Sequence, residues 1–254
     1  MSAYYTALAP MADLFAAGNP VLTYHKLGPR PRGVRLKGLY VSRARFARQL
    51  RELQRAGFGS GRLEDCTGPR HAARVVITFD DGYVNVLEHG LPALAQAKFT
   101  AIQFLPVRAL GGRNDWDVAA GEAPERIMDP AQVREWLAAG HAIGSHTLTH
   151  PHLTQIPEAD AREEITASRK WLEDTFGLAV RHFCYPYGDW NAAVRALVIE
   201  AGYATASTTE AGVNGPGSDP WSLKRFTARY PSRNWRTFRA WLGSWWTQRR
   251  TVAA

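Results

Sequence analysis

Short apolar runs alternate along this chain with longer segments whose apolar residues recur three and four positions apart. The short runs are rich in β-branched and aromatic residues and end in polar residues or glycine, a pattern typical of buried strands. They predict about seven strands, at 20–25, 75–79, 99–105, 141–143, 181–185, 203–207 and 223–227.

The longer segments carry the signals that begin and end helices. Ser42 is a candidate N-cap for a helix that ends at Gly57. Three residues form the apolar face of this helix: Phe46, Leu50 and Leu53. Asp129 followed by Pro130 combines an N-cap with a proline in the first turn, which predicts a second helix.

Further helices are predicted at 86–97, 157–176 and 194–201, and a long loop at 110–126. In the helix at 157–176 we expect Ile165, Trp171 and Leu172 to be buried. Strands and helices therefore alternate through the 254 residues, and no linker or repeat interrupts them. This pattern predicts one α/β domain with a parallel sheet closed, or nearly closed, into a (β/α) barrel.

Four of the predicted strands end in residues that carry chemistry. These ends are His25, the pair Asp80 and Asp81, the segment around His146, and the YPYG turn at 185–188. The carboxyl ends of parallel strands gather at one face of a barrel. We therefore expect these four ends to lie close together.

Asp80 and Asp81 follow the apolar run at 75–79 directly, and Gly82 comes next. Two adjacent carboxylates at the end of a buried strand repel one another unless positive charge lies beside them, and a bound metal ion commonly supplies that charge. The alternative is an Asp-Gly turn in which one acid caps the next helix.

His146 and His150 are four residues apart, so a helical turn beginning at Ser145 would point both imidazoles the same way. Two histidines and one carboxylate leave positions open for water and substrate, which is typical of catalytic metal sites. One aspartate then binds the metal, and the other takes a proton from water. The YPYG turn either aims the backbone N–H of Tyr187 at the oxyanion of a hydrolysis or serves packing alone.

Three motifs in this order and spacing resemble those of the polysaccharide deacetylase family, also called the NodB-homology domain or carbohydrate esterase family 4. They are TFDDG at 78–82, SHTLTH at 145–150 and YPYG at 185–188, and the resemblance covers about residues 22–230. It implies a distorted (β/α) barrel. It also implies removal of N-acetyl or O-acetyl groups from glycans with a divalent metal, often zinc.

Carried over by position, the resemblance assigns a role to each motif residue. Asp80 corresponds to the general base, and Asp81, His146 and His150 correspond to the metal ligands. Tyr187 corresponds to the residue whose backbone amide helps to hold the oxyanion.

The chain departs from the family pattern at two places. Cys184 stands where an arginine usually tunes the base, and Arg225 is either its substitute or a surface charge. No histidine follows His182, so the family's late histidine, which protonates the leaving amine, has no counterpart. A branch that deacetylates exopolysaccharides uses an early strand ending in Tyr-His, which Tyr24 and His25 resemble. We therefore expect His25 to be the general acid, with a buried structural histidine as the alternative.

Composition and charge bear on partners and compartment. The net charge of +8 favours anionic partners, although a general arginine bias explains it equally well. Residues 1–18 make a poor secretory signal, and no apolar window is long enough to span a bilayer, which predicts a cytoplasmic chain or one peripheral at the membrane. The two cysteines allow at most one disulfide and offer no metal-finger spacing.

Residues 233–250 alternate arginine with tryptophan and phenylalanine at helical spacing. This part of the final segment, 231–254, predicts a helix with a basic face and an aromatic face that lies in a membrane interface or packs on the barrel. In the first case a lipid-linked sugar becomes a candidate substrate. Nucleic acid is a weak third partner, since no nucleic-acid-binding motif is present.

The sequence therefore predicts a metal-dependent deacetylase, with zinc as the expected ion, that acts on an acetylated polysaccharide or glycolipid precursor. One rival is a hydrolase of another non-peptide C–N bond on the same fold. The other is a non-catalytic member that binds glycans or attaches to membranes, which the missing arginine and late histidine favour and the four intact motif residues oppose.

Overall fold

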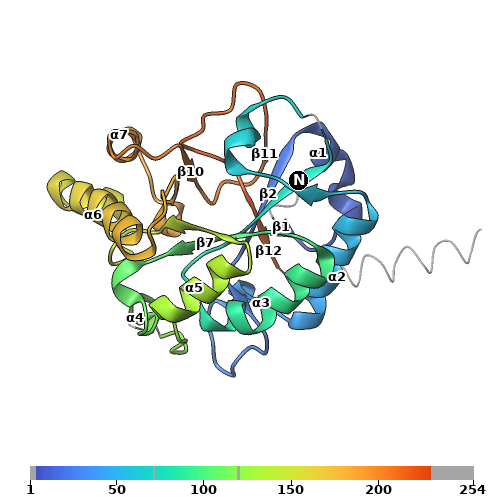
Figure 1. Ribbon diagram of the computed structural model, residues 1–254, viewed down its shortest axis with the longest axis horizontal. Helices are drawn as coiled ribbons and strands as arrows, with labels where there is room; N and C mark the ends of the chain where they lie inside the picture. Colours follow the sequence, from blue (N-terminus) through green and yellow to red (C-terminus); the bar gives the residue numbers. More distant parts are fainter. Residues whose placement is uncertain (1–3, 71, 119–120, 230–254) are drawn as a thin grey trace, which may run out of the picture.

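The protein is described by a computed structural model that places residues 4–70, 72–118 and 121–229. Its main feature is a curved sheet in which eight strands of the described chain follow one another with parallel pairing (Figure 1). Their order is β1 (Tyr4–Tyr5), β12 (Phe226–Ala228), β2 (Asn19–Tyr24), β6 (Arg74–Phe79), β7 (Ile102–Leu105), β8 (Ala142–Ser145), β9 (His182–Cys184) and β10 (Thr205–Ser207). The sheet forms a half-barrel with β1 and β10 at its two ends, which confirms the distorted (β/α) barrel.

Four short strands lie beside this path. β5 (Gly59–Ser60) pairs with β6, and β11 (Val213–Asn214) pairs antiparallel with β2. β3 (Lys26–Leu27) and β4 (Tyr40–Val41) form a separate parallel pair.

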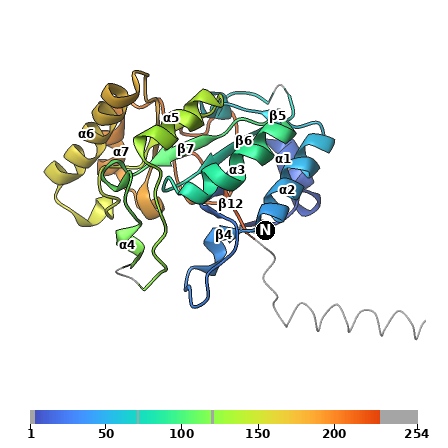
Figure 2. The ribbon, with the colours of Figure 1, turned by 60° about the horizontal axis from the view of Figure 1, so that its bottom comes forward.

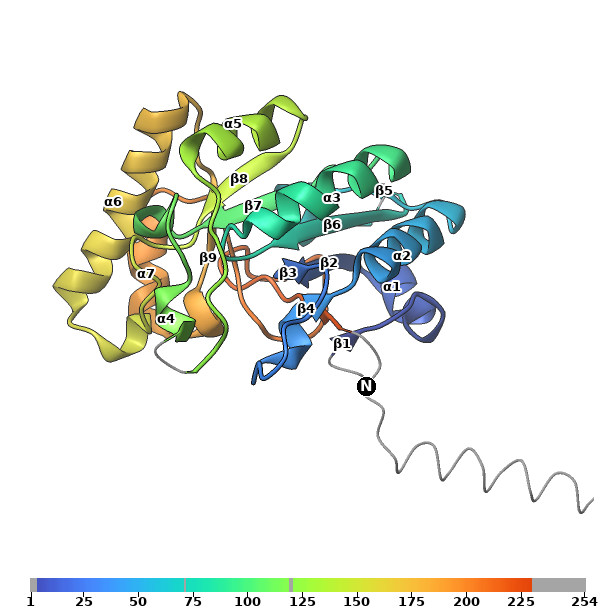
Figure 3. The ribbon, with the colours of Figure 1, turned by 90° about the horizontal axis from the view of Figure 1, so that it is seen from below.

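The helices lie around the sheet, most of them on its outer side (Figures 1 and 3). They are α1 (Ala12–Ala17), α2 (Arg43–Arg55), α3 (Val84–Ala97), α4 (Asp115–Val118), α5 (Pro130–Ala138), α6 (Glu158–Phe176) and α7 (Ala192–Glu200). α2 contacts α3, α3 contacts α5, and α6 contacts both α7 and β8 (Figures 2 and 3). No helix of the described chain is long and apolar enough to cross a membrane.

Both faces of the central strands are buried, as their continuous apolar runs predict. Tyr24, Phe46, Phe79 and Trp136 pack edge to face or tilted between the sheet and the helices, with ring centroids 4.9–5.9 Å apart. A second cluster fills the concave side of the sheet and includes Val21, Val76, Phe104 and Cys184. Cys184 and Cys66 are both free thiols, buried in the fold.

Two helix starts agree with the predicted caps. The Ser42 hydroxyl accepts a hydrogen bond from the Arg45 N–H at 3.4 Å. The Asp129 side chain and Gln132 form a reciprocal capping box with Pro130 in the first turn.

Other predictions need correction. Trp171 is 36% exposed rather than buried, because Ile165 and Leu172 face the core from one side of α6 and Trp171 lies at the edge of that face against Phe176. The predicted loop at 110–126 contains the short helix α4.

The strand register places the predicted site residues at one level. Tyr24 pairs with Phe79, so His25 and Asp80 leave the sheet side by side. Ser145 pairs with Phe183, so His146 lies next to Cys184. The site therefore forms where β2, β6, β8 and β9 end.

Candidate metal and catalytic site

Asp80 and Asp81 directly follow β6 and contact different partners. Asp81 and Gly82 both have positive φ values, 73° and 74°, and this sharp turn leads the chain away from the sheet toward α3. Both carboxylates are buried, with 2% and 4% of their residue surface exposed. Each therefore requires a compensating charge within the protein.

Asp81, His146 and His150 converge on one point. The Asp81 Oδ1 atom lies 3.4 Å from the Nε2 atoms of both histidines, and the three candidate ligand atoms lie within 4.8 Å of one another. Burial acts to raise the pKa of the Asp81 carboxyl, but hydrogen bonds with the two imidazoles hold it well below its usual range. The carboxyl is therefore ionised and suited to binding a cation.

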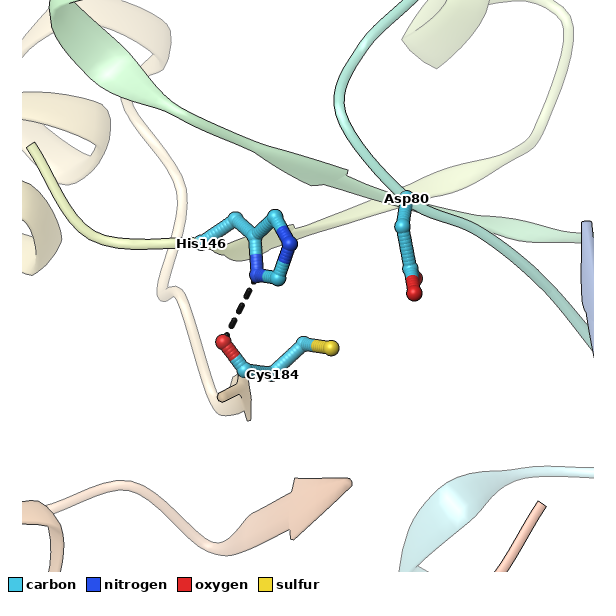
Figure 4. Close-up of side chains that lie close together, drawn as sticks. All are labelled: Asp80, His146 and Cys184. Atoms are coloured by element: carbon cyan, nitrogen blue, oxygen red, sulfur yellow. Dashed lines mark hydrogen bonds between the residues drawn. The ribbon is translucent and has the colours of Figure 1, made fainter. Parts of the chain in front are cut away.

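A further contact fixes how His146 presents its ring. Its Nδ1 atom lies 2.7 Å from the Cys184 carbonyl oxygen and donates to it (Figure 4), so Nε2 is the ring nitrogen that faces Asp81. A backbone carbonyl that orients a histidine in this way is typical of metal sites in proteins. The two-histidine, one-carboxylate donor set fits Zn²⁺ and similar divalent ions.

The segment between the two histidines is not the helical turn that the sequence suggested. Thr147 and His150 have φ values of 71° and 65°, which lie in the left-handed region and not in a right-handed helix. The centroids of the two rings nevertheless lie 4.8 Å apart. The two histidines therefore converge as predicted, but the prediction that a helical turn brings them together is wrong.

Asp80 is bound by Arg225 through two parallel hydrogen bonds. Nη1 donates to Oδ1 at 2.9 Å and Nη2 donates to Oδ2 at 2.8 Å. The guanidinium is 1% exposed and also contacts Thr78 Oγ1 at 3.0 Å and Cys184 Sγ at 3.1 Å. Arg225 is thus not a surface charge, and it reaches Asp80 from just before β12.

This pairing decides the charge of Asp80. Burial acts to raise the pKa of the carboxyl, and the opposing effects of Arg225 and then His25 hold it below its usual range. The Cys184 thiol and the Asp80 carboxylate lie close together (Figure 4), and Arg225 Nη2 contacts both, at 3.1 and 2.8 Å.

His25 lies beside Asp80, and the Tyr187 ring contacts the ring of His150, with their centroids 4.6 Å apart. The His25 Nε2 atom is 3.8 Å from Asp80 Oδ2, its side chain is 16% exposed, and its Nδ1 atom is buried without a hydrogen-bond partner in the described chain. Tyr187 has a φ value of 59° and is 44% exposed, with its ring stacked on His152 at 3.8 Å. The structure therefore brings all seven predicted residues into one region.

Some residues of the site were not predicted. Trp116 of α4 stacks on His150 at 4.6 Å, and the Thr78 hydroxyl contacts Arg225. Thr78 lies within a recognised motif, but Trp116 lies in a segment whose composition indicated only a loop. Nothing in its local sequence pattern marks it.

Comparison with known protein families identifies the family to which this chain belongs. The polysaccharide deacetylase family profile matches residues 67–206, more than half of the chain, and the chain belongs to this family. The resemblance drawn from the motifs is confirmed.

Two curated relatives illustrate the match. A chitooligosaccharide deacetylase of Sinorhizobium fredii is 30% identical over 135 residues, which cover 52% of this chain and 55% of the relative. A peptidoglycan-N-acetylglucosamine deacetylase of Bacillus cereus is 31% identical over 124 residues, covering 48% of this chain and 39% of the relative. The match thus spans about half or less of these proteins.

Solved structures match over a larger part of the chain. IcaB from Ammonifex degensii has a TM-score of 0.72 and 26% identity, covering 88% of this chain and 96% of IcaB. The deacetylase PplD of Streptococcus pyogenes has a TM-score of 0.71 and 19% identity over 84% of this chain and 92% of PplD, and supports the fold.

Proposed function

We propose that this chain is a metal-dependent deacetylase that hydrolyses an acetyl group, in the first instance an N-acetyl group, from a polysaccharide or glycolipid precursor. One observation carries the proposal. An ionised aspartate held by Arg225 lies directly beside a carboxylate and two imidazoles whose ligand atoms converge. This arrangement supports a hydrolysis in which one acid binds a metal and its neighbour moves a proton.

Asp81, His146 and His150 would hold the metal, and Zn²⁺ is the ion that we expect. Once bound, a divalent cation supplies Lewis acidity, which polarises the acetyl carbonyl and lowers the pKa of water. Asp80 accepts the proton of the attacking water, a role suited to a carboxylate that Arg225 keeps ionised. The C–N bond then breaks, so acetate and a free amine are released.

Three further residues complete the proposal. Arg225 takes the place of the arginine that the third motif lacks, and it orients Asp80 through two hydrogen bonds. His25 donates the proton that the leaving amine needs, which its position beside Asp80 supports. The backbone N–H of Tyr187 contributes to holding the oxyanion.

The substrate class follows from the family and its named relatives. Relatives described as chitooligosaccharide and peptidoglycan N-acetylglucosamine deacetylases support an N-acetylated amino sugar as the reacting unit. Tyr24 and His25 resemble the early strand end of the exopolysaccharide-type branch, which supports that branch for this chain. Since Arg225 contacts Asp80, the missing third-motif arginine no longer favours a non-catalytic member.

Acetate release tests this function. Purified chain loaded with Zn²⁺ is expected to release acetate from acetylated chitooligosaccharides or acetylated polymers. Asp80→Asn should abolish turnover and retain the metal, because it removes the base and not a ligand. His25→Ala should lower kcat on the order of 10²-fold with metal content unchanged, since general acid catalysis typically contributes at least that much.

The controls separate the roles. His89→Ala replaces another partly buried histidine, on α3, and should leave kcat unchanged. Full turnover by His25→Ala alongside an inactive Asp80→Asn would remove His25 from the mechanism. A metal-loaded chain that releases no acetate but binds glycan would favour the non-catalytic rival.

The membrane contact predicted for residues 233–250 lies outside the described residues and remains a proposal based on their sequence pattern. It makes a lipid-linked sugar a candidate substrate and the membrane surface a candidate location. Co-sedimentation with anionic liposomes at low salt should capture the full chain. A chain that stays in the supernatant would contradict this proposal.

A further inference from the structure

The loop between His146 and His150 has an unusual backbone conformation. Thr147 and His150 hold left-handed backbone conformations, with φ values of 71° and 65°. Such conformations are unfavourable in non-glycine residues, and they persist only where surrounding contacts enforce them. Some group must therefore hold this loop in place.

Backbone contacts explain one side of the loop. The carbonyl oxygens of Thr147 and Leu148 accept hydrogen bonds from the N–H groups of Val107 and Arg108, at 3.1 and 2.8 Å. These contacts hold the loop carbonyls against the turn that follows β7. These hydrogen bonds involve only the carbonyl groups of the loop, so its N–H groups require other acceptors.

The N–H groups of Thr147 and His150 donate to the hydroxyls of Ser145 and Thr147, at 3.3 and 3.0 Å, and Glu164 of α6 binds the two N–H groups between them. Its Oε2 atom accepts from the N–H groups of Leu148 and Thr149, at 2.8 and 2.9 Å. Its Oε1 atom accepts from the Thr149 hydroxyl at 2.6 Å. A single carboxylate thus binds the middle of the loop through three short hydrogen bonds, and charge-assisted bonds of this kind are stronger than neutral ones.

α6 is well suited to hold this carboxylate. The helix packs against β8, the strand that leads into the loop, and Ser168 on its buried face contacts the Ser145 hydroxyl at 2.7 Å. Glu164 lies one helical turn before Ser168, so the two side chains lie on the same side of α6. Ser168 contacts β8, and Glu164 contacts the loop that follows β8. The histidine pair is therefore fixed relative to a long helix and not by its own loop alone.

We propose that Glu164 is a positioning residue for the metal site, and that its carboxylate holds the loop in the conformation in which both imidazoles face Asp81. The inference rests on the metal site of the proposed function. It does not require Glu164 to contact the metal or the substrate.

Metal affinity of the full chain tests this role. Glu164→Ala should raise the dissociation constant for Zn²⁺ and Co²⁺ by about 10–100-fold, the usual effect of losing a group that orients a metal ligand. Glu164→Gln should lie between Glu164→Ala and the unchanged chain, because the amide oxygen still accepts from the loop. Chelator competition measures both constants, and the visible spectrum of the Co²⁺ form reports the ligand geometry.

A second measurement follows the loop without metal. Hydrogen exchange at Leu148 and Thr149 in the metal-free chain should be faster in Glu164→Ala than in the unchanged chain. Glu163→Ala is the matched control, since Glu163 is an exposed neighbour on α6 and should change neither affinity nor exchange.

The outcomes separate this inference from the proposed function. Unchanged metal affinity in Glu164→Ala, or an equal loss in Glu163→Ala, overturns the positioning role. Weaker metal binding in Glu164→Ala, in a chain that releases no acetate from any glycan, supports the positioning role and overturns the deacetylase. A chain that binds neither Zn²⁺ nor Co²⁺ overturns both.

Discussion

At the scale of single residues, the two adjacent aspartates acquire different roles from their neighbours. Asp80 is bound by a guanidinium, and Asp81 is bound by two imidazoles. Both carboxyls have lowered pKa values although burial alone would raise them. The same residue type, one position apart, is thus prepared for proton transfer in one case and for metal binding in the other.

Arg225 is the residue whose replacement tests this division most directly. Arg225→Lys keeps a positive charge but cannot make two parallel hydrogen bonds to Asp80, so the carboxylate loses its fixed orientation. We expect kcat/KM for acetate release to fall on the order of 10²-fold, since a poorly oriented base loses much of its contribution. Lys224→Ala, which changes the exposed cation next in sequence, should leave kcat/KM unchanged.

Wild-type turnover in Arg225→Lys would show that the guanidinium geometry is not required. The amount of bound zinc should be the same in Arg225→Lys and in the unchanged chain, since Arg225 contacts the base and none of the proposed ligands. Loss of metal from Arg225→Lys would instead place its effect on Asp81 and the histidines.

The site residues differ in how far the sequence could predict them. Asp80, Asp81, His146 and His150 stand in short motifs, so their shared position could be inferred from spacing and strand ends. Arg225 could be named only as a candidate, because 145 positions separate it from Asp80 and no local pattern records that contact. The left-handed backbone at Thr147 and His150 could not be foreseen, since a β-branched threonine disfavours it and only a small share of histidines adopt it.

At the scale of secondary-structure elements, a buried ion pair connects two segments near the site. Lys26 of β3 has its Nζ atom 3.8 Å from Asp117 Oδ2 of α4, and the lysine side chain is fully buried. The same ammonium lies 5.0 Å and 4.7 Å from the ring centroids of Tyr40 and Tyr83. Asp117 directly follows Trp116, which stacks on His150. The pair therefore links β3 to the segment that covers a proposed metal ligand.

Removing one member of this pair should destabilise the fold. Lys26→Met keeps most of the side-chain volume but leaves Asp117 buried without its cation, which typically costs about 3–5 kcal/mol of unfolding free energy. The double variant Lys26→Met with Asp117→Asn should recover most of that loss, because no unpaired charge remains. Urea unfolding of the unchanged chain, the two single variants and the double variant measures the coupling between Lys26 and Asp117.

A surface pair provides the comparison. Lys170 and Asp174 are 77% and 64% exposed, so Lys170→Met should leave the unfolding midpoint unchanged. An equally small effect of Lys26→Met would mean that the buried pair contributes nothing to stability.

The secondary-structure elements were predicted with unequal success, because some are marked by signals close in the sequence and others depend on distant residues. The caps at Ser42 and Asp129 act within one helical turn, and sequence alone identified them. β1 is two residues long and pairs with Thr227 and Ala228 at the other end of the described chain, so no local signal marks it. Trp171 was predicted to be buried because it is apolar, but its position around the axis of α6 places it at the edge of the buried face.

At the scale of the whole molecule, the proposed metal ligands join distant parts of the chain. Asp81 follows β6, and His146 and His150 follow β8, so one ion would tie together two strands separated in the sheet by β7. The ligand atoms already lie within 4.8 Å of one another in the folded chain. Unfolding would separate them, so the metal should bind the folded state in preference.

This preference makes thermal stability a test of the metal site that does not depend on turnover. A ligand present at 100 times its dissociation constant stabilises the folded state by about 2.7 kcal/mol. For a chain of this size, each kcal/mol shifts Tm by about 2–4 °C, so added Zn²⁺ should raise Tm by about 5–10 °C and chelation should reverse the shift.

Asp81→Asn distinguishes binding at this site from binding elsewhere on the surface. The amide keeps the shape of the side chain but lacks the charge that the donor set supplies, so the zinc-dependent shift in Tm should be lost or greatly reduced. Asp80→Asn should keep the full shift, because Arg225 binds both Asp80 carboxylate oxygens and Asp81 keeps its contacts with the two histidines. An equal zinc response in both variants would assign the metal to other residues, and would leave Asp80 and Asp81 without the separate roles that their neighbours indicate.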